Sequence, residues 1–321
     1  MDTLKGLGLA LGFIVALSAR VAAETWPTRP VQVVVPAGAG GVTDGIARVV
    51  AQSLRERLGQ AFVVENRPGG NGIVGVTSAS KASPDGYTLM IGTNTTMAAN
   101  NFLYKTFTVD PLRDFAPLAV VVDTPMSLVV PPNSPFNSVR ELVAAAKAQP
   151  GRFNYGAGTS SALLCTEFLK AIAGIDLVKV TYRSSPQALV DLLAGRLDLL
   201  CEPLAGGRVN ASEGKLKMLA LAGAQRSSLA PDLPTIAEAG FPGMDYSAWI
   251  AFWAPSGTPP EITKRLSAEI VSIMREPGTL KRMADLGSDL RIGGPDVLHA
   301  LQRAEIEKIG ILVKQVGIVA E

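Results

Sequence analysis

Apolar runs of strand length alternate with longer stretches of helical apolar spacing from residue 31 onward. Residues 31–35 form a β-branched run, and residues 44–58 carry apolar side chains three or four positions apart. A second β-rich run covers residues 61–64, and a third covers residues 87–91. Short strands that alternate with amphipathic helices predict βαβ units, and therefore a parallel sheet with helices on its faces.

The same alternation begins again further along the chain. Residues 115–122 and 126–130 are two β-rich runs broken by Asp123-Thr124-Pro125, and Ser138 and Glu141 have the spacing of a capping box before a helix over 138–149. The pattern predicts further strands and helices over residues 153–155, 162–173, 178–182, 186–193, 197–201, 217–221, 249–254, 259–274 and 295–313. We therefore expect two α/β units.

The N-terminus has the pattern of a secretory signal. Lys5 precedes an apolar run over residues 6–18, and Val21-Ala22-Ala23 offers small residues before a cut. The run is shorter than the roughly 20 residues of a bilayer-spanning helix. We expect cleavage after Ala23 and a mature chain exported from the cytoplasm; an uncleaved anchor would leave the domains outside the cytoplasm as well.

Composition narrows the chemistry. The chain has 321 residues, of which 47% are apolar and 18% charged, with 30 basic and 28 acidic side chains. This length suits about two domains. The near balance of charges argues against a nucleic-acid-binding protein, which would have an excess of basic residues. A single histidine and two cysteines leave too few ligands for a zinc or iron–sulfur site built from them. No cofactor or metal is expected.

The two cysteines, Cys165 and Cys201, lie in apolar sequence. Export would place them in a compartment that permits disulfides. A structural disulfide and two buried free thiols are both compatible with the sequence.

Loops rich in glycine, serine and threonine follow predicted strands in both units. Residues 38–44 and 156–161 each precede a helix, and Thr93-Asn94-Thr95-Thr96 follows the third strand. Glycine lets the backbone approach a ligand, and a helix N-terminus offers free N–H groups and a positive dipole end. Thr43 and Asp44 also suit an ordinary N-cap. Because ligands bind outside the carboxyl ends of parallel strands, we expect an anion in a cleft between the units.

Two enzyme classes fit less well. A dinucleotide site would use the loop at 38–44 with Glu65, but the loop lacks the last glycine of G-x-G-x-x-G. A serine hydrolase would use Ser160 or Ser161 with Asp296 and His299, but Ala162 replaces the final glycine of G-x-S-x-G. We expect no enzyme activity.

A series of short motifs resembles the Bug family, the periplasmic substrate-binding proteins of tripartite tricarboxylate transporters. The resemblance runs in order through the whole mature chain and rests on Trp26-Pro27-Thr28-Arg29-Pro30, Gly40-Gly41-Val42-Thr43-Asp44, Val64-Glu65-Asn66-Arg67-Pro68-Gly69-Gly70, Pro84-Asp85-Gly86-Tyr87-Thr88-Leu89, Asp114-Phe115-Ala116-Pro117, Gly158-Thr159-Ser160, Asp191-Leu192-Leu193-Ala194-Gly195-Arg196, Pro234-Thr235-Ile236-Ala237-Glu238-Ala239-Gly240 and Ala254-Pro255-Ser256-Gly257-Thr258-Pro259.

The resemblance implies an α/β periplasmic binding protein of type II, a Venus flytrap of two domains with two crossovers around a ligand cleft. Domain 1 would comprise residues 24–123 and 226–321, domain 2 residues 124–225, and the hinge would lie near 123–125 and 223–225. The implied function is capture of a small organic acid and its delivery to the membrane permease subunits, by a monomer that binds no nucleic acid. The alternatives are a ligand sensor for a membrane partner and the secreted hydrolase.

The resemblance also implies which residues hold the ligand. These are Gly41, Val42, Thr43, Asp44, Thr93, Asn94 and Thr95 in the first domain, and Gly158, Thr159, Ser160, Ser161, Tyr182, Arg183 and Glu202 in the second. Met97 and Ala162 stand where relatives often have histidine. We therefore expect an acid with some apolar or aromatic bulk rather than citrate.

Overall fold

The computed structural model describes residues 26–182 and 184–320, so the predicted signal peptide (residues 1–23) and Arg183 lie outside the described residues. The elements in chain order are β1 (Val31–Val35), α1 (Val42–Leu58), β2 (Phe62–Asn66), η1 (Gly70–Gly72), α2 (Ile73–Ser80), β3 (Thr88–Thr93), η2 (Thr95–Ala99), α3 (Asn100–Leu103), β4 (Phe115–Val130), α4 (Val139–Ala148), β5 (Asn154–Ala157), α5 (Ser160–Ala173), β6 (Val178–Thr181), α6 (Ser185–Leu193), β7 (Leu199–Pro203), α7 (Leu204–Ser212), β8 (Lys217–Leu221), β9 (Ser247–Pro255), α8 (Pro260–Met274), α9 (Pro277–Asp285), β10 (Asp289–Gly293) and α10 (Pro295–Val316).

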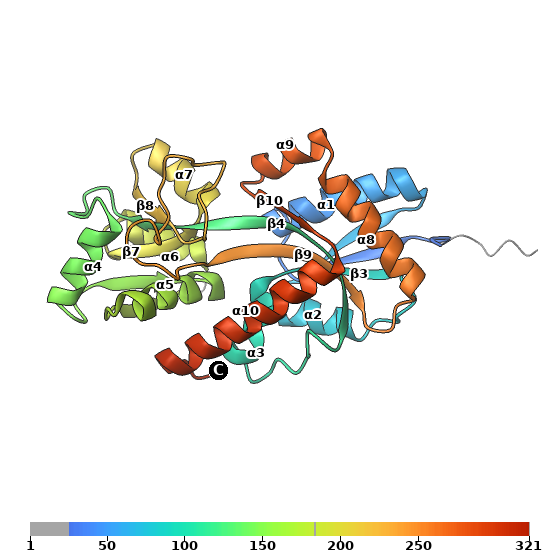
Figure 1. The fold of residues 1–321 in the computed structure, drawn as a ribbon, viewed down its shortest axis with the longest axis horizontal. Helices are drawn as coiled ribbons and strands as arrows, with labels where there is room; N and C mark the ends of the chain where they lie inside the picture. Colours follow the sequence, from blue (N-terminus) through green and yellow to red (C-terminus); the bar gives the residue numbers. More distant parts are fainter. Residues whose placement is uncertain (1–25, 183, 321) are drawn as a thin grey trace, which may run out of the picture.

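The strands form one continuous path in the order β2-β1-β3-β9-β4-β7-β5-β6, with β10 and β8 also paired to β4. β4 and β9 run along the long axis between two groups of helices (Figure 1). β1, β2 and β3 are mutually parallel in the first half, and β5, β6 and β7 are parallel in the second. The expected pair of α/β units is confirmed.

The strand β4 differs from its prediction. The sequence predicts two runs separated at Asp123-Thr124-Pro125, whereas the structure has one strand of 16 residues. Pro117 lies beside a register shift in the pairing with β9, and Pro125 pairs with Ser247 where β9 begins. Proline is tolerated in a strand where the hydrogen-bond ladder is irregular or ends. The two proline positions therefore do not break the strand.

The hydrophobic core follows the two halves. Helices α1 and α8 cover one face of the first sheet through residues such as Ile46 and Leu266, and α5 contributes Leu164 and Phe168 to the core of the second half. Ile236, Met244 and Tyr246, which the predicted boundaries place in domain 1, belong to the core of the second half.

The last helix, α10, packs against both halves. Leu298 near its start lies in a core cluster with strands of the first half, and Ile309 and Leu312 lie in the core of the second. Figure 1 shows α10 running diagonally from one group of helices toward the other. In residues 26–182 and 184–320, no helix is both long enough and apolar enough to span a bilayer.

Several helices are absent from the prediction because their sequences lack the usual helical pattern. The run Ile-Val-Gly-Val-Thr-Ser-Ala-Ser of α2 is rich in β-branched residues and contains glycine, both of which have low helix propensity. Half of the predicted capping box before α4 is found, since the hydroxyl of Ser138 accepts a hydrogen bond from the Glu141 N–H at 3.2 Å. The Glu141 carboxylate accepts from the Asn137 N–H at 2.7 Å instead of from the Ser138 N–H.

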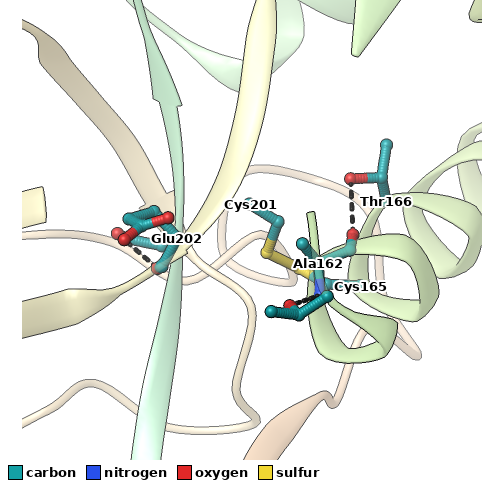
Figure 2. Close-up of a disulfide and its surroundings, with 7 residues drawn as sticks. Ala162, Cys165, Thr166, Cys201 and Glu202 are labelled. Atoms are coloured by element: carbon teal, nitrogen blue, oxygen red, sulfur yellow. Dashed lines mark hydrogen bonds between the residues drawn. A yellow bond between two sulfur atoms is a disulfide. The ribbon is translucent and has the colours of Figure 1, made fainter. Parts of the chain in front are cut away.

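A disulfide joins Cys165 on α5 to Cys201 on β7, which resolves the alternative left by the sequence (Figure 2). The two Cα atoms are 6.3 Å apart and 36 positions separate the residues. Both cysteines are almost fully buried. The bond ties the helix that starts at the cleft to the central strand of the second half.

We expect the disulfide to stabilise the fold by about 3–4 kcal/mol, because it closes a loop of this length in the unfolded chain. Urea unfolding of the protein with and without dithiothreitol measures this difference. The double variant Cys165→Ala/Cys201→Ala is the control and should be insensitive to the reductant. An unchanged midpoint for the reduced protein would contradict a stabilising role.

Candidate functional site

The carboxyl ends of the parallel strands of both halves face each other near the middle of β4. β9 is antiparallel to both β3 and β4, so β3 runs in the direction of β4, and β7 runs in the opposite direction. The loops after these strands therefore meet at one place. There they enclose a cavity of about 380 Å³, lined by Pro36, Ala37, Thr43, Pro68, Gly69, Asn71, Gly72, Thr93, Thr95, Thr96, Thr159, Ser160 and Ser161.

Many of the residues around this cavity, which we call the first chamber, carry a hydroxyl group. The hydroxyl-bearing side chains are Thr43, Thr93, Thr95, Thr96, Thr159, Ser160 and Ser161, and none of the lining side chains is charged. A hydroxyl both donates and accepts hydrogen bonds. The chamber can therefore surround an anion with donors without a buried cation.

Two hydroxyl pairs connect the walls of the chamber directly. The Thr95 Oγ1 and Ser161 Oγ atoms are 2.9 Å apart, and the Tyr104 hydroxyl lies 3.3 Å from the Ser160 Oγ. The Asn71 side-chain amide donates to the same Tyr104 hydroxyl. Asn71 also has a positive φ of 51°, a conformation that asparagine tolerates better than most residues. Loops from the two halves are thus in contact at the site.

Helices α1 and α5 both begin at the chamber. Gly41, the N-cap of α1, has no side chain, so no side-chain cap occupies the first N–H groups of α1. Thr159 caps α5 by accepting a hydrogen bond from the Ala162 N–H at 3.1 Å. The positive ends of two helix dipoles are therefore close to the cavity and favour an anion there.

Asp44 has a structural function in the first loop. Its carboxylate accepts hydrogen bonds from the Gly40 N–H at 2.9 Å, the Arg48 guanidinium at 3.0 Å and the Asn66 amide at 3.0 Å. Burial raises the pKa of Asp44, but the bonds from Arg48, Gly40 and Asn66 outweigh burial and hold the pKa below its ordinary value. Asp44 fixes the shape of the loop, and Arg48 offsets its charge.

Asn94 is likewise occupied by the scaffold. Its side chain is fully buried, accepts from the Thr95 N–H at 3.0 Å and donates to the Ser247 carbonyl at 3.0 Å. Thr93 and Thr96 exchange hydrogen bonds with each other across the turn after β3. These bonds shape the turn so that the hydroxyl of Thr95 reaches the second wall.

A second chamber of about 360 Å³ adjoins the first. It is lined by Asn71, Tyr104, Ala157, Gly158, Thr159, Ser160, Leu163, Lys179, Thr181 and Tyr182. A Cβ on Gly158 would lie 2.5 Å from the backbone of Ser184, so only glycine permits this close approach. The Tyr182 hydroxyl donates to Asp191 at 2.7 Å.

The positions predicted as ligand-binding therefore divide into groups. Thr43, Thr93, Thr95, Thr159, Ser160 and Ser161 line the first chamber, Thr159 and Ser160 also line the second, and Gly158 and Tyr182 line the second alone. Gly41, Val42, Asp44, Asn94 and Glu202 line neither chamber, and Arg183 lies outside the described residues. The sequence analysis missed Asn71, Tyr104 and Lys179, for which no local pattern gives a signal.

Positions considered for other functions are placed elsewhere. Met97 and Ala162 are fully buried and line neither chamber, so any effect on ligand choice would be indirect. His299 is exposed on α10 and lines neither chamber. The two candidate serines make their side-chain bonds with Thr95 and Tyr104 instead. In the described part of the chain, no cluster of three or more metal-binding side chains is found.

Glu202 is a buried carboxyl group at the end of β7. It follows Cys201 and lies on the opposite side of the strand from the disulfide (Figure 2). Its residue is 8% exposed, and the Oε2 atom has no hydrogen-bond partner among the described residues. Burial raises the pKa of Glu202 to about 7. The folded protein therefore keeps this proton up to about pH 7, well above the pH at which an ordinary glutamate loses it.

The two α/β halves, the shared strand and the polar interdomain cleft define the class of periplasmic binding proteins. Residues 46–318 match the family model described as "Tripartite tricarboxylate transporter family receptor". The chain belongs to this family, and the Bug resemblance is confirmed by relatives that carry the name.

Two curated relatives illustrate the similarity. The UPF0065 protein in the tcbD-tcbE intergenic region of Pseudomonas sp. (strain P51) is 35% identical over 94% of this chain and 90% of its own length. Protein BugT of Bordetella pertussis is 34% identical over 94% of this chain and 93% of its own. The similarity therefore extends over almost the whole of each protein.

Solved structures agree with the fold. The R. palustris protein Rpa4515 with adipate has a TM-score of 0.82 and 34% sequence identity, covering 92% of this chain and 100% of that one. MatC from Rhodopseudomonas palustris with bound malate has a TM-score of 0.76 and 30% identity, covering 90% and 100%. The predicted periplasmic binding protein fold is confirmed.

Glu202 should make stability depend on pH. Below the unfolded pKa near 4.5 both states hold the proton; between this value and about 7 only the unfolded state ionises, so stability falls as pH rises. Between pH 5 and 8 we expect the free energy of unfolding of Glu202→Gln to fall by about 2–3 kcal/mol less than that of the native protein. Urea unfolding measures this difference. Glu307→Gln, at an exposed position, is the matched control; an equal pH dependence in Glu202→Gln and the native protein would contradict the assignment.

Proposed function

We propose that this protein is a periplasmic solute-binding protein that holds a small organic acid in the interdomain cleft and delivers it to the permease of a tripartite tricarboxylate transporter. The observation that carries the proposal is the first chamber, in which seven hydroxyl-bearing side chains surround a cavity without a charged lining residue. The N-termini of α1 and α5 add positive dipole ends. This environment suits a carboxylate.

The binding energy needed is within reach of such a site. A hydrogen bond to a charged group contributes about 1.5–3 kcal/mol. Four or five of them give a gross gain of roughly 6–15 kcal/mol, from which ordering costs are subtracted. Micromolar binding requires about 8 kcal/mol. Hydroxyl and backbone donors can therefore hold an acid without arginine.

The relatives support the ligand class. One structural neighbour was solved with adipate and another with malate, and both are carboxylic acids. The proposed ligand residues are Thr43, Thr93, Thr95, Thr159, Ser160 and Ser161 around the first chamber, with Gly158 and Tyr182 in the second. Gly41 and Val42 contribute through the backbone at the start of α1.

Export, partner and domain limits belong to the same proposal. The apolar run near the N-terminus supports a cleaved signal peptide and a periplasmic location. The family supports a membrane permease as the partner and a binding role without catalysis. For the domains, the packing of Met244 and Tyr246 favours a second crossover near residue 246 rather than 226.

A thermal-shift screen of the purified protein against mono-, di- and tricarboxylates tests this function. A ligand present at 100 times its dissociation constant should add about 2.7 kcal/mol of stability, and the acid should be recovered unchanged. Ser160→Ala should weaken the response by about tenfold in affinity, whereas Ser212→Ala, on the far end of α7, should leave it unchanged. A screen without any shift, or consumption of the acid, would count against the proposal.

A further inference from the structure

Polar side chains from separate elements converge in the interior behind the first chamber. Glu305 belongs to α10, Tyr246 directly precedes β9, and Asn94 is the N-cap of η2. Their exposed fractions are 4%, 0% and 0%. Burial is the main cause that raises the pKa of Glu305 and of Tyr246, and the neighbouring Asn94 side chain acts against it in both cases. Asn94 is therefore a common neighbour of the other two, and we call the place where they meet the buried polar site.

Each of these side chains has a polar atom that the protein leaves free to bond. The Glu305 Oε2 atom lies 2.7 Å from the Lys308 Nζ atom, but Glu305 Oε1 and the Tyr246 hydroxyl have no hydrogen-bond partner among the described residues. The Asn94 amide has two N–H donors. One of them donates to the Ser247 carbonyl at 3.0 Å. The buried polar site therefore offers a carboxyl oxygen, a hydroxyl and an amide N–H.

The charges around the site favour a neutral ligand. Lys308 contacts the Glu305 carboxyl group and also donates to the backbone carbonyl of Asp245 at 2.8 Å. The Asp245 carboxylate accepts from the Ala224 N–H at 3.2 Å. A cation in the buried polar site would be repelled by Lys308, and an anion would be repelled by Glu305. A small molecule that both donates and accepts hydrogen bonds meets neither obstacle.

Water has the size and the bonding capacity that the site requires. Buried polar groups without a partner destabilise a fold, so proteins pair almost all of them with protein atoms or with ordered water. A buried water typically makes about three hydrogen bonds to groups that the protein leaves unpaired. One donated bond to Glu305 and two accepted bonds, from Tyr246 and Asn94, would satisfy all three groups together.

We propose that the buried polar site binds one structural water molecule, which donates to Glu305 Oε1 and accepts from the Tyr246 hydroxyl and the Asn94 amide. Tyr246 belongs to the core of the second half, and Asn94 follows β3 of the first half. The water thus connects both halves with α10. The inference goes beyond the proposed function, because the site is formed without any residue of the second chamber and holds its water whichever acid the cleft binds.

A crystal structure of the native protein, at a resolution that shows ordered water, tests the site directly. We expect one well-ordered water at about 2.7–3.2 Å from the Glu305 Oε1, Tyr246 Oη and Asn94 Nδ2 atoms. It should be present in crystals grown with and without a dicarboxylate. A direct bond between Tyr246 and Glu305, or the absence of water density among the three groups, would overturn the proposal and leave the proposed function intact.

Urea unfolding of Tyr246→Phe tests the same site in solution. Removal of the hydroxyl takes one partner from the water, and we expect the equilibrium constant for folding to fall about tenfold. Tyr87→Phe is the matched control, because the Tyr87 hydroxyl bonds to Thr28 at an exposed position where solvent replaces it. If Tyr246→Phe were as stable as the native protein or more stable, its hydroxyl would have no partner, and the proposal would be wrong.

Discussion

The shared strand β4 is the constraint on which the site depends. Its first part pairs with β9 and β10, and its last part pairs with β7 and β8. Because β3 runs in the direction of β4 and β7 runs against it, the carboxyl ends of both parallel groups must face the same point. Loops that are more than 60 positions apart in the chain, such as those holding Thr95 and Ser161, are thereby brought within hydrogen-bond distance.

The charged side chains near the cleft are mostly committed to holding this geometry. Asp44 organises the first loop with Arg48 and Asn66, and Glu167 is satisfied by Lys170 and Tyr155. An acid that enters the first chamber therefore meets neutral donors and helix ends. Fixed dipoles of this kind stabilise a carboxylate without a buried cation. Burying a cation would cost desolvation free energy and so weaken the net gain from binding.

The sequence predicted the architecture better than the site. Periodicity located most strands and the longer helices, and the family motifs placed the loops. The sequence could not show that Asp44 and Asn94 turn their side chains toward the scaffold, because the same residue types cap helices and bind ligands. Tyr104 and Lys179 were missed for another reason: each lies in a segment without a motif and reaches the cleft only through tertiary packing. The continuous strand β4 was predicted as two runs because a proline in the sequence usually marks the end of a strand.

Two buried ionisable groups, Glu305 and Tyr246, lie behind the cleft. Glu305 on α10 is buried, its pKa is raised by burial against the opposing effect of Lys308, and its Oε1 atom has no partner among the described residues. The buried Tyr246 hydroxyl, whose pKa is raised by burial and by the charge of Glu305, likewise has no partner there. Asn94 connects this region to Ser247 and to the turn that carries Thr95. These buried groups lie between α10 and the turn that carries Thr95, so α10 supports the scaffold behind the first chamber although it contributes no side chain to that chamber.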